Sequence, residues 1–181
     1  MCKEGEKMEM INQRINELLS ELLGKLFSLN RIFDRAMSDL AVTHKATNSS
    51  KILHENMAHF FLKFADEISS YQQSRGMLTR YPATAEGNQT YENPLQFYEV
   101  ALEEMMKFED AVCDVIDICN VEKDWSTENF LKGIIKTWNP YLETISSIAD
   151  ACRNYGSDFK SQMQFDDEIE DYLTIPNLVG D

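Results

Sequence analysis

Hydrophobic side chains recur every three or four residues along most of this chain, which is the spacing that places them on one face of an α-helix. The longest pattern runs unbroken from about residue 6 to residue 42, and it predicts a first helix of roughly 50 Å at 1.5 Å per residue. Its main apolar positions are Met8, Ile11, Ile15, Leu18, Leu22, Leu26, Leu29, Phe33 and Leu40. A second pattern starts near Leu53 and predicts a helix that extends to about Thr79. Tyr81-Pro82 stops this helix, because a residue before proline disfavours helical geometry.

Two further helices are predicted after a polar connection of about a dozen residues, which either crosses one end of the bundle or offers a contact surface. Asn93-Pro94 is a typical helix start, with asparagine as the N-cap and proline in the first turn. The third helix then runs to about Cys119. The fourth has apolar positions from Leu131 to Tyr155, with an expected kink or restart at Pro140 and an end at Gly156.

Glycine and proline are scarce, at 7 and 4 residues, and no segment has the alternating pattern of a strand. We therefore predict an all-α fold, in which residues 1–157 form an antiparallel bundle of about four long amphipathic helices. The sequence leaves open whether this bundle is compact or elongated.

The charge balance narrows the possible partners. The chain has 31 acidic and 17 basic residues, a net charge of −14, so it should repel nucleic acids and anionic membrane surfaces. No segment approaches the roughly eighteen apolar residues that a membrane-spanning helix needs. The charged N-terminal residues also lack the apolar region of a signal peptide, which favours a cytoplasmic protein.

Residues 52–61, ILHENMAHFF, are close to the His-Glu-x-x-His motif of zinc proteases. Two zinc-binding histidines on a helix must lie one turn apart, at i and i+4. His54 and His59 are five apart and would diverge by roughly 140° on an α-helix, so we do not expect them to share a metal. Glu55 and His59 do stand at i and i+4, but they would need ligands from elsewhere. The sequence therefore predicts no metal site and no cofactor.

A di-iron centre is the second metal hypothesis. The segments INQRINELL and HFFLKFADEISSYQQSRG resemble the first two helices of a ferritin, whose bundle holds two irons with carboxylates and Glu-x-x-His motifs. Glu17 is displaced by one position from the ligand place, and Ile68 and Tyr71 stand where a glutamate and a histidine are needed. The chain contains no Glu-x-x-His, so a ferritin-like, carboxylate-bound metal protein is kept only as the alternative function.

The third helix carries an acidic face, which is either a solvated surface or a surface for a divalent cation or a basic partner. Its residues are Glu99, Glu103, Asp110, Asp114 and Asp117. Catalysis finds no support, because there is neither a Gly-x-Ser-x-Gly elbow nor a glycine-rich phosphate loop. The four cysteines are expected to be free thiols rather than disulfides. We therefore predict that the protein is not an enzyme.

Residues 158–181 are predicted to be an acidic, flexible tail, or one that folds back with its few apolar side chains. Tyr172-x-x-Ile175 follows several acidic residues and resembles the motif that docks to ubiquitin-like autophagy modifiers as an added β-strand. It also resembles a tyrosine-based sorting signal. The predicted partner-binding residues are Asp166, Asp167, Glu168, Glu170, Asp171, Tyr172 and Ile175.

A wider resemblance spans roughly residues 33–111. The matching positions are Phe33, Leu40, Ala41, Phe64, Ala65, Pro94, Leu95 and Phe97, and their rhythm is similar to that of BAR and arfaptin-type domains. This resemblance implies an elongated helical dimer that binds proteins such as small GTPases or trafficking factors. Together with the acidic exterior and the tail motif, it predicts a non-catalytic interaction module. We expect an oligomeric adaptor, scaffold or regulatory subunit in membrane trafficking or autophagy, docking a partner with a basic surface.

Overall fold

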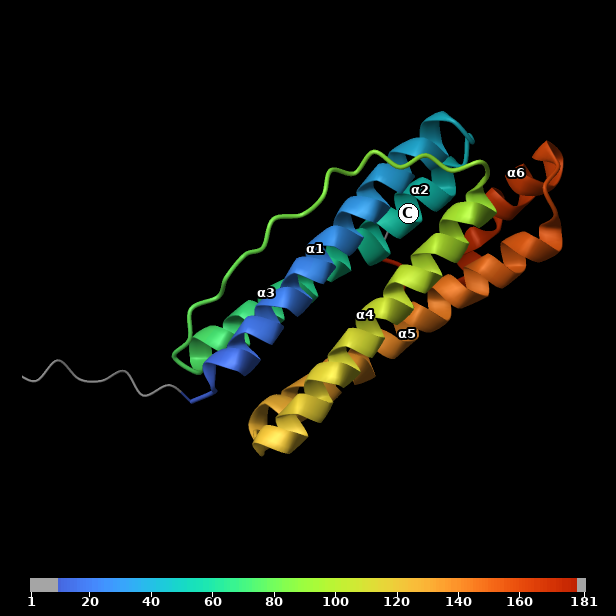
Figure 1. Ribbon diagram of the computed structural model, residues 1–181. Coiled ribbons are helices and arrows are strands. Elements are labelled where there is room, and N and C mark those ends of the chain that lie inside the picture. The colour runs from blue at the N-terminus through green and yellow to red at the C-terminus, as the bar shows by residue number, and fades with distance from the viewer. Residues whose placement is uncertain (1–9, 179–181) are drawn as a thin grey trace, which may run out of the picture.

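The computed structural model describes residues 10–178 as an all-helical bundle, which confirms the predicted fold class (Figure 1). Four long rods form it: α1 (Gln13–Val42), the composite of α2 (Thr47–Leu53), η1 (His54–Ala58) and α3 (His59–Ser74), then α4 (Pro94–Glu122) and α5 (Trp125–Tyr155). Two short helices follow, α6 (Phe159–Asp167) and η2 (Ile169–Tyr172). Within residues 10–178, no helix is long and apolar enough to cross a membrane.

The helix boundaries follow the local signals in the sequence. The side-chain oxygens of Asn12 and Asn93 each accept a hydrogen bond from the backbone N–H three residues later, at 2.8 and 2.9 Å. These bonds satisfy donors that the first turn of a helix leaves unpaired. The fourth rod, α5, passes through Pro140 without a break and ends at Gly156, whose φ of 86° favours glycine.

The connection between α3 and α4, residues 75–93, runs along the side of the bundle rather than across its end (Figure 1). Its contacts with α1 progress along both segments: Leu78 with Asn16, Pro82 with Gly24, and Gln89 with Arg35. A Cβ atom at Gly24 would lie 2.9 Å from the Pro82 ring, so glycine permits this close approach. The crossover makes α3 and α4 parallel, while α1 with α3 and α4 with α5 form antiparallel pairs.

Aromatic side chains fill the core between the four rods. The following aromatic residues of α1, α3, α4 and α5 are at most 1% exposed: Phe33, Phe61, Phe64, Phe97, Tyr98, Phe108 and Trp138. The Trp138 ring lies 5.7 Å from Phe61, 5.5 Å from Phe64 and 4.6 Å from Phe108, measured between ring centroids. Tilted and edge-on contacts of this kind stabilise a core beyond the burial of the rings themselves.

Residues 159–178 pack against the bundle, so of the two predicted alternatives, a flexible tail and a tail that folds back, the structure has the second. Phe165 and Ile169 are 1% and 0% exposed. The buried Asp166 carboxylate accepts hydrogen bonds from the backbone N–H groups of Asn48 and Ser49, at 3.1 and 2.8 Å, and from the Ser49 hydroxyl at 2.6 Å. These N–H groups belong to the first turn of α2, whose own N-cap residue makes no side-chain bond. Asp166 therefore caps α2 from a distant part of the chain.

Candidate metal centre

A metal centre inside a helical bundle requires carboxylate and imidazole groups that project between the helices. Among residues 10–178, the fully buried acidic residues are Asp39 and Asp166, and both already accept hydrogen bonds from protein donors. Half-buried Glu109 of α4 adds one buried oxygen without a partner among these residues, and one such oxygen is too few for a centre that needs several carboxylates and histidines. At the middle of the bundle, Trp138 Nε1 has no hydrogen-bond partner in the described part of the chain, and an indole N–H cannot ligate a metal. The interior residues therefore do not fit a dinuclear iron centre.

The three positions compared with ferritin ligands confirm this mismatch. Glu17 is exposed, and its carboxylate accepts a hydrogen bond from the Gln13 amide at 3.1 Å. Ile68 is fully buried. The Tyr71 ring stacks on Phe130 with centroids 4.1 Å apart, and it offers no imidazole to the interior.

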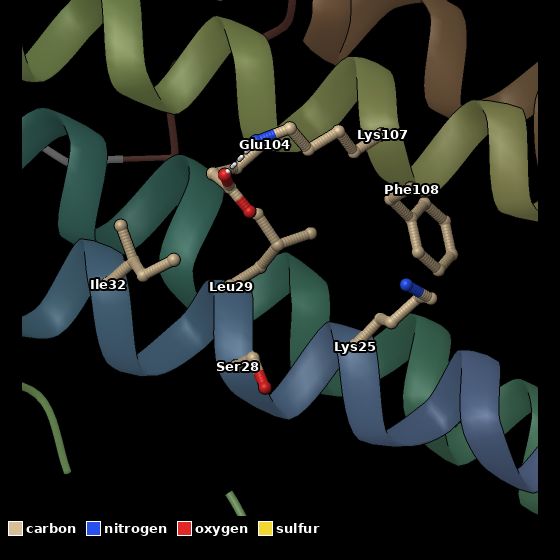
Figure 2. Close-up of a pocket in the computed structure, with 7 residues that line it drawn as sticks. All are labelled: Lys25, Ser28, Leu29, Ile32, Glu104, Lys107 and Phe108. Atoms are coloured by element: carbon tan, nitrogen blue, oxygen red, sulfur yellow. Dashed lines mark hydrogen bonds and ion pairs between the residues drawn. The ribbon is translucent and has the colours of Figure 1, made fainter. Parts of the chain in front are cut away.

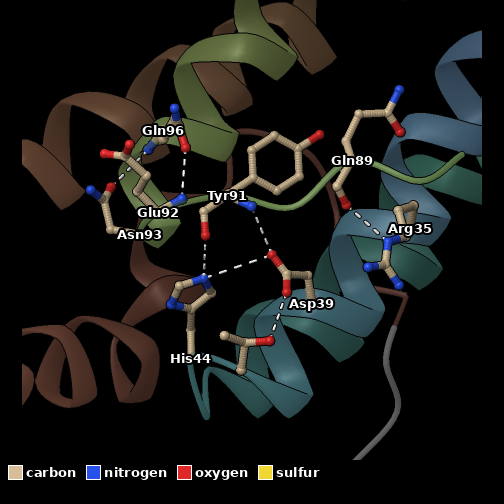
Figure 3. A network of polar contacts seen from close by, with 9 residues as sticks. Arg35, Asp39, His44, Gln89, Tyr91, Glu92, Asn93 and Gln96 are labelled. Carbon is tan, nitrogen blue, oxygen red and sulfur yellow. Dashed lines mark hydrogen bonds and ion pairs between the residues drawn. The ribbon is translucent and has the colours of Figure 1, made fainter.

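Asp39 holds the junction between α1, the crossover and α4 (Figure 3). Its carboxylate accepts hydrogen bonds from the Thr43 hydroxyl at 2.7 Å and from the Tyr91 backbone N–H at 3.0 Å. Burial acts to raise the pKa of Asp39, but these bonds, with nearby His44 and Arg35, hold that pKa below its ordinary value. This carboxylate is a structural anchor, and its oxygens are already engaged.

A hollow of about 260 Å³ opens between α1 and α4 (Figure 2). Its lining comprises Lys25, Ser28, Leu29, Ile32, Glu104, Lys107 and Phe108. The Glu104 carboxylate lies 2.7 Å from Lys107 Nζ, and Lys25 adds a second positive charge. This arrangement disfavours a cation, so the hollow does not supply the missing metal site.

The acidic face of α4 is exposed at all five predicted positions, Glu99, Glu103, Asp110, Asp114 and Asp117. Glu99 lies 3.0 Å from Arg153, and Glu103 lies 2.8 Å from Lys107. Such exposed ion pairs contribute little to stability. The residues share one helix, but the structure does not gather them into a closed site.

The residues of the predicted tail motif are divided between the core and the surface. Asp166 is buried, Ile175 is 8% exposed, and the half-buried Tyr172 lies with its hydroxyl 3.1 Å from that of Tyr155. Glu168 also accepts a hydrogen bond from the Tyr155 hydroxyl. The remaining acids are exposed: Asp167, Glu170 and Asp171. Strand addition through this motif would require the segment to leave the bundle.

The described cysteines are free thiols, with Cys113 exposed and Cys119 and Cys152 buried. Burial raises the pKa of both the Cys119 and Cys152 thiols to about 11. Both thiols are therefore protonated at neutral pH. Because only the thiolate form is an effective nucleophile or metal ligand, neither cysteine is a candidate for such a role.

Three potential ligands meet on the surface of the second rod, where the sequence predicted none. His54, Glu55 and His59 each offer one ligand atom, and these atoms lie within 4.8 Å of one another. The two imidazole centroids are 4.4 Å apart, so the expectation that His54 and His59 diverge is wrong. The reason is that η1 is a turn of π-helix, in which the His59 N–H donates to the His54 carbonyl. In such a turn, residues i and i+5 lie on the same side.

Tertiary contacts surround this π turn. Asn30 of α1 donates from its side-chain amide to the Ala58 carbonyl at 3.1 Å. The buried Asn56 side chain donates to Asn177 at 2.9 Å and accepts from the Leu178 backbone N–H at 2.6 Å. A side chain that hydrogen-bonds to a backbone carbonyl of a helix, as Asn30 does to Ala58, is a recognised cause of local departures from α-helical geometry. The spacing of apolar residues along the sequence does not indicate this π turn.

The fold now defines a class of protein. Four long helices with one crossover along the side of the bundle are the arrangement of ferritin-like proteins. The family model of the ferritin-like domain matches residues 43–154, more than half of the chain, and the chain therefore belongs to this family.

Solved structures agree with this assignment at the level of the fold. An open-pore ferritin from the hyperthermophilic archaeon Archaeoglobus fulgidus superposes with a TM-score of 0.81 at 18% identity, covering 88% of this chain and 97% of that one. A humanized archaeal ferritin gives a TM-score of 0.80 at 16% identity, covering 94% and 99%. A comparison with curated proteins finds no match.

Family membership corrects the predicted relation to BAR and arfaptin-type domains. That resemblance depended on phenylalanine, leucine and alanine positions that many amphipathic helices share. The adaptor and scaffold function is wrong for the same reason, and the small-GTPase partner has no remaining support.

Proposed function

We propose that this chain is a ferritin-type subunit, which assembles with copies of itself and takes part in iron storage without a dinuclear oxidation centre inside its own bundle. The observation that carries the proposal is a combination of two facts. The fold matches archaeal ferritins over 97–99% of their length, whereas aromatic rings fill the interior of this bundle.

Assembly is supported by apolar side chains that the single chain leaves in water. Leu62 of α3 and Leu78 and Tyr81 of the crossover are 36%, 82% and 60% exposed. Exposed apolar groups that lie on neighbouring elements are typical of a protein–protein interface.

A role with iron is supported by charge. The exposed Asp110, Asp114 and Asp117 of α4 make no ion pair among the described residues. With a net charge of −14, this exterior attracts cations. Carboxylate oxygens are suitable ligands for hard metal ions.

Two measurements on the full-length protein test the proposal. Light scattering coupled to size exclusion should give the mass of a defined oligomer at micromolar concentration. After Fe²⁺ is added in air, iron oxidation and oxygen consumption should match a protein of similar charge that lacks a dinuclear centre. A ferritin with an intact dinuclear centre serves as the positive control.

A monomer would contradict the assembly part of the proposal. Rapid oxidation of two Fe²⁺ ions per chain would contradict the other part, because it would require an interior centre that these residues do not provide.

A further inference from the structure

We propose that His54, Glu55 and His59 bind a divalent first-row transition-metal ion such as Zn²⁺ on the outer face of the second helical rod. This inference is independent of the proposed function, because it concerns exposed side chains outside the bundle interior.

Each imidazole lies close to one oxygen of the Glu55 carboxylate, and one donor atom from each of the three residues lies within 4.8 Å of the others. His54 Nδ1 lies 3.4 Å from Glu55 Oε1, and His59 Nδ1 lies 3.4 Å from Glu55 Oε2. Two ligands with bonds of about 2.1 Å at a tetrahedral angle are themselves about 3.4 Å apart. The three side chains are 40–51% exposed, so the small rotations that bring all donors to this spacing meet little resistance.

A fourth residue faces the first imidazole from α1. Asp34 of α1 places Oδ1 3.6 Å from His54 Nε2. This distance is longer than a hydrogen bond, so the exposed ring would have to rotate slightly to donate an Nε2–H to Asp34 when the ion replaces the proton that Nδ1 shares with Glu55. A carboxylate behind a ligating histidine is a common support of metal sites, because it fixes the ring and raises its basicity.

The donor set selects the class of metal. Two imidazole nitrogens and one carboxylate suit zinc, nickel, copper or cobalt, whereas calcium and magnesium prefer oxygen donors throughout. Three protein ligands leave room for water in the remaining position. The π turn is essential to the site, because it brings together two histidines that an α-helix would separate.

Titration with Zn²⁺ by calorimetry tests the site, and Co²⁺ absorption reports its geometry. The wild-type protein should bind one ion per chain at the site. His54→Ala and His59→Ala should each weaken binding at least about tenfold, and Asp34→Asn about tenfold. Circular dichroism verifies that each variant keeps the wild-type helix content.

Two controls make the result specific. Glu67→Gln changes an exposed carboxylate on the same rod and should leave binding unchanged, as should Cys113→Ser, which removes the exposed thiol. The proposal is overturned if the wild-type protein binds no Zn²⁺ at micromolar concentration. His54, Glu55 and His59 would then only form hydrogen bonds with one another. It is also overturned if both histidine variants bind as the wild type does, or if Cys113→Ser alone abolishes binding.

Discussion

Replacing Trp138 by alanine tests the physical basis of the argument against an interior metal centre, which is a closely packed aromatic core. Trp138 is 1% exposed and contacts rings of Phe61, Phe64 and Phe108 from two other helices. Truncation leaves a cavity at the middle of the bundle. The neighbouring rings cannot fill it without losing their own partners, for example the edge-on contact of Phe61 with Phe33 at 4.8 Å.

The expected cost follows from the buried area. A buried tryptophan removes roughly 200 Å² from water, or about 5 kcal/mol at about 25 cal/mol per Å², and alanine retains part of this. Truncations of buried aromatic residues cost about 3–5 kcal/mol, so we expect the free energy of unfolding to fall by that amount. For a chain of this length, the melting temperature should fall by about 6–20 °C.

Guanidinium unfolding, followed by far-UV circular dichroism, measures this loss. The experiment is repeated at several protein concentrations, because dissociation of an oligomer would couple to unfolding. Trp125→Ala is the matched control: Trp125 is 60% exposed, and its loss should change the free energy of unfolding by less than about 0.5 kcal/mol. If Trp138→Ala costs less than about 1 kcal/mol, the centre is not a tightly packed apolar core, and the argument against interior ligands fails.

Two buried carboxylates give further predictions. Asp39→Asn should lower the free energy of unfolding by about 1–3 kcal/mol at pH 7. Because the pKa of Asp39 is lower in the native state than its ordinary 3.8, this difference should stay constant above about pH 5 and shrink as the pH falls below 4. Urea titrations at several pH values check this, and a difference that persists unchanged to pH 2 would contradict it. Asp166→Ala should cost about 2–4 kcal/mol and speed proteolysis within α6, whereas Ser49→Ala, which removes one of the three bonds, should cost only about 1 kcal/mol. Equal losses for these two variants would show that Asp166 does not cap α2.

Much of the fold could be predicted because it depends on local signals. Apolar spacing located the long helices, and Asn93-Pro94 and Gly156 marked the start of α4 and the end of α5. The connection before α4 was recognised, but its predicted length of about a dozen residues was too short, because α3 ends at Ser74 and not near Thr79. Its path could not be predicted, because it depends on contacts such as that of Pro82 with Gly24, which join distant parts of the chain.

The family was misjudged for a different reason. The sequence argument kept a ferritin-like protein only as the alternative, because Ile68 and Tyr71 stand where metal ligands were sought. Packing of apolar helix faces, however, determines the bundle, and a fold can persist without the site that its relatives carry. The missing ligands are evidence about chemistry and not about architecture.

The sequence by itself determined the four long helices and which of their faces are buried, because both depend on neighbours three or four positions away. Only the tertiary structure decided that His54 and His59 meet, because their encounter requires a π turn in place of an α-helical one. That turn lies among hydrogen bonds from Asn30, on another helix, and from Asn56 to the C-terminal segment. Partners so far apart in the chain leave no periodic trace in the sequence.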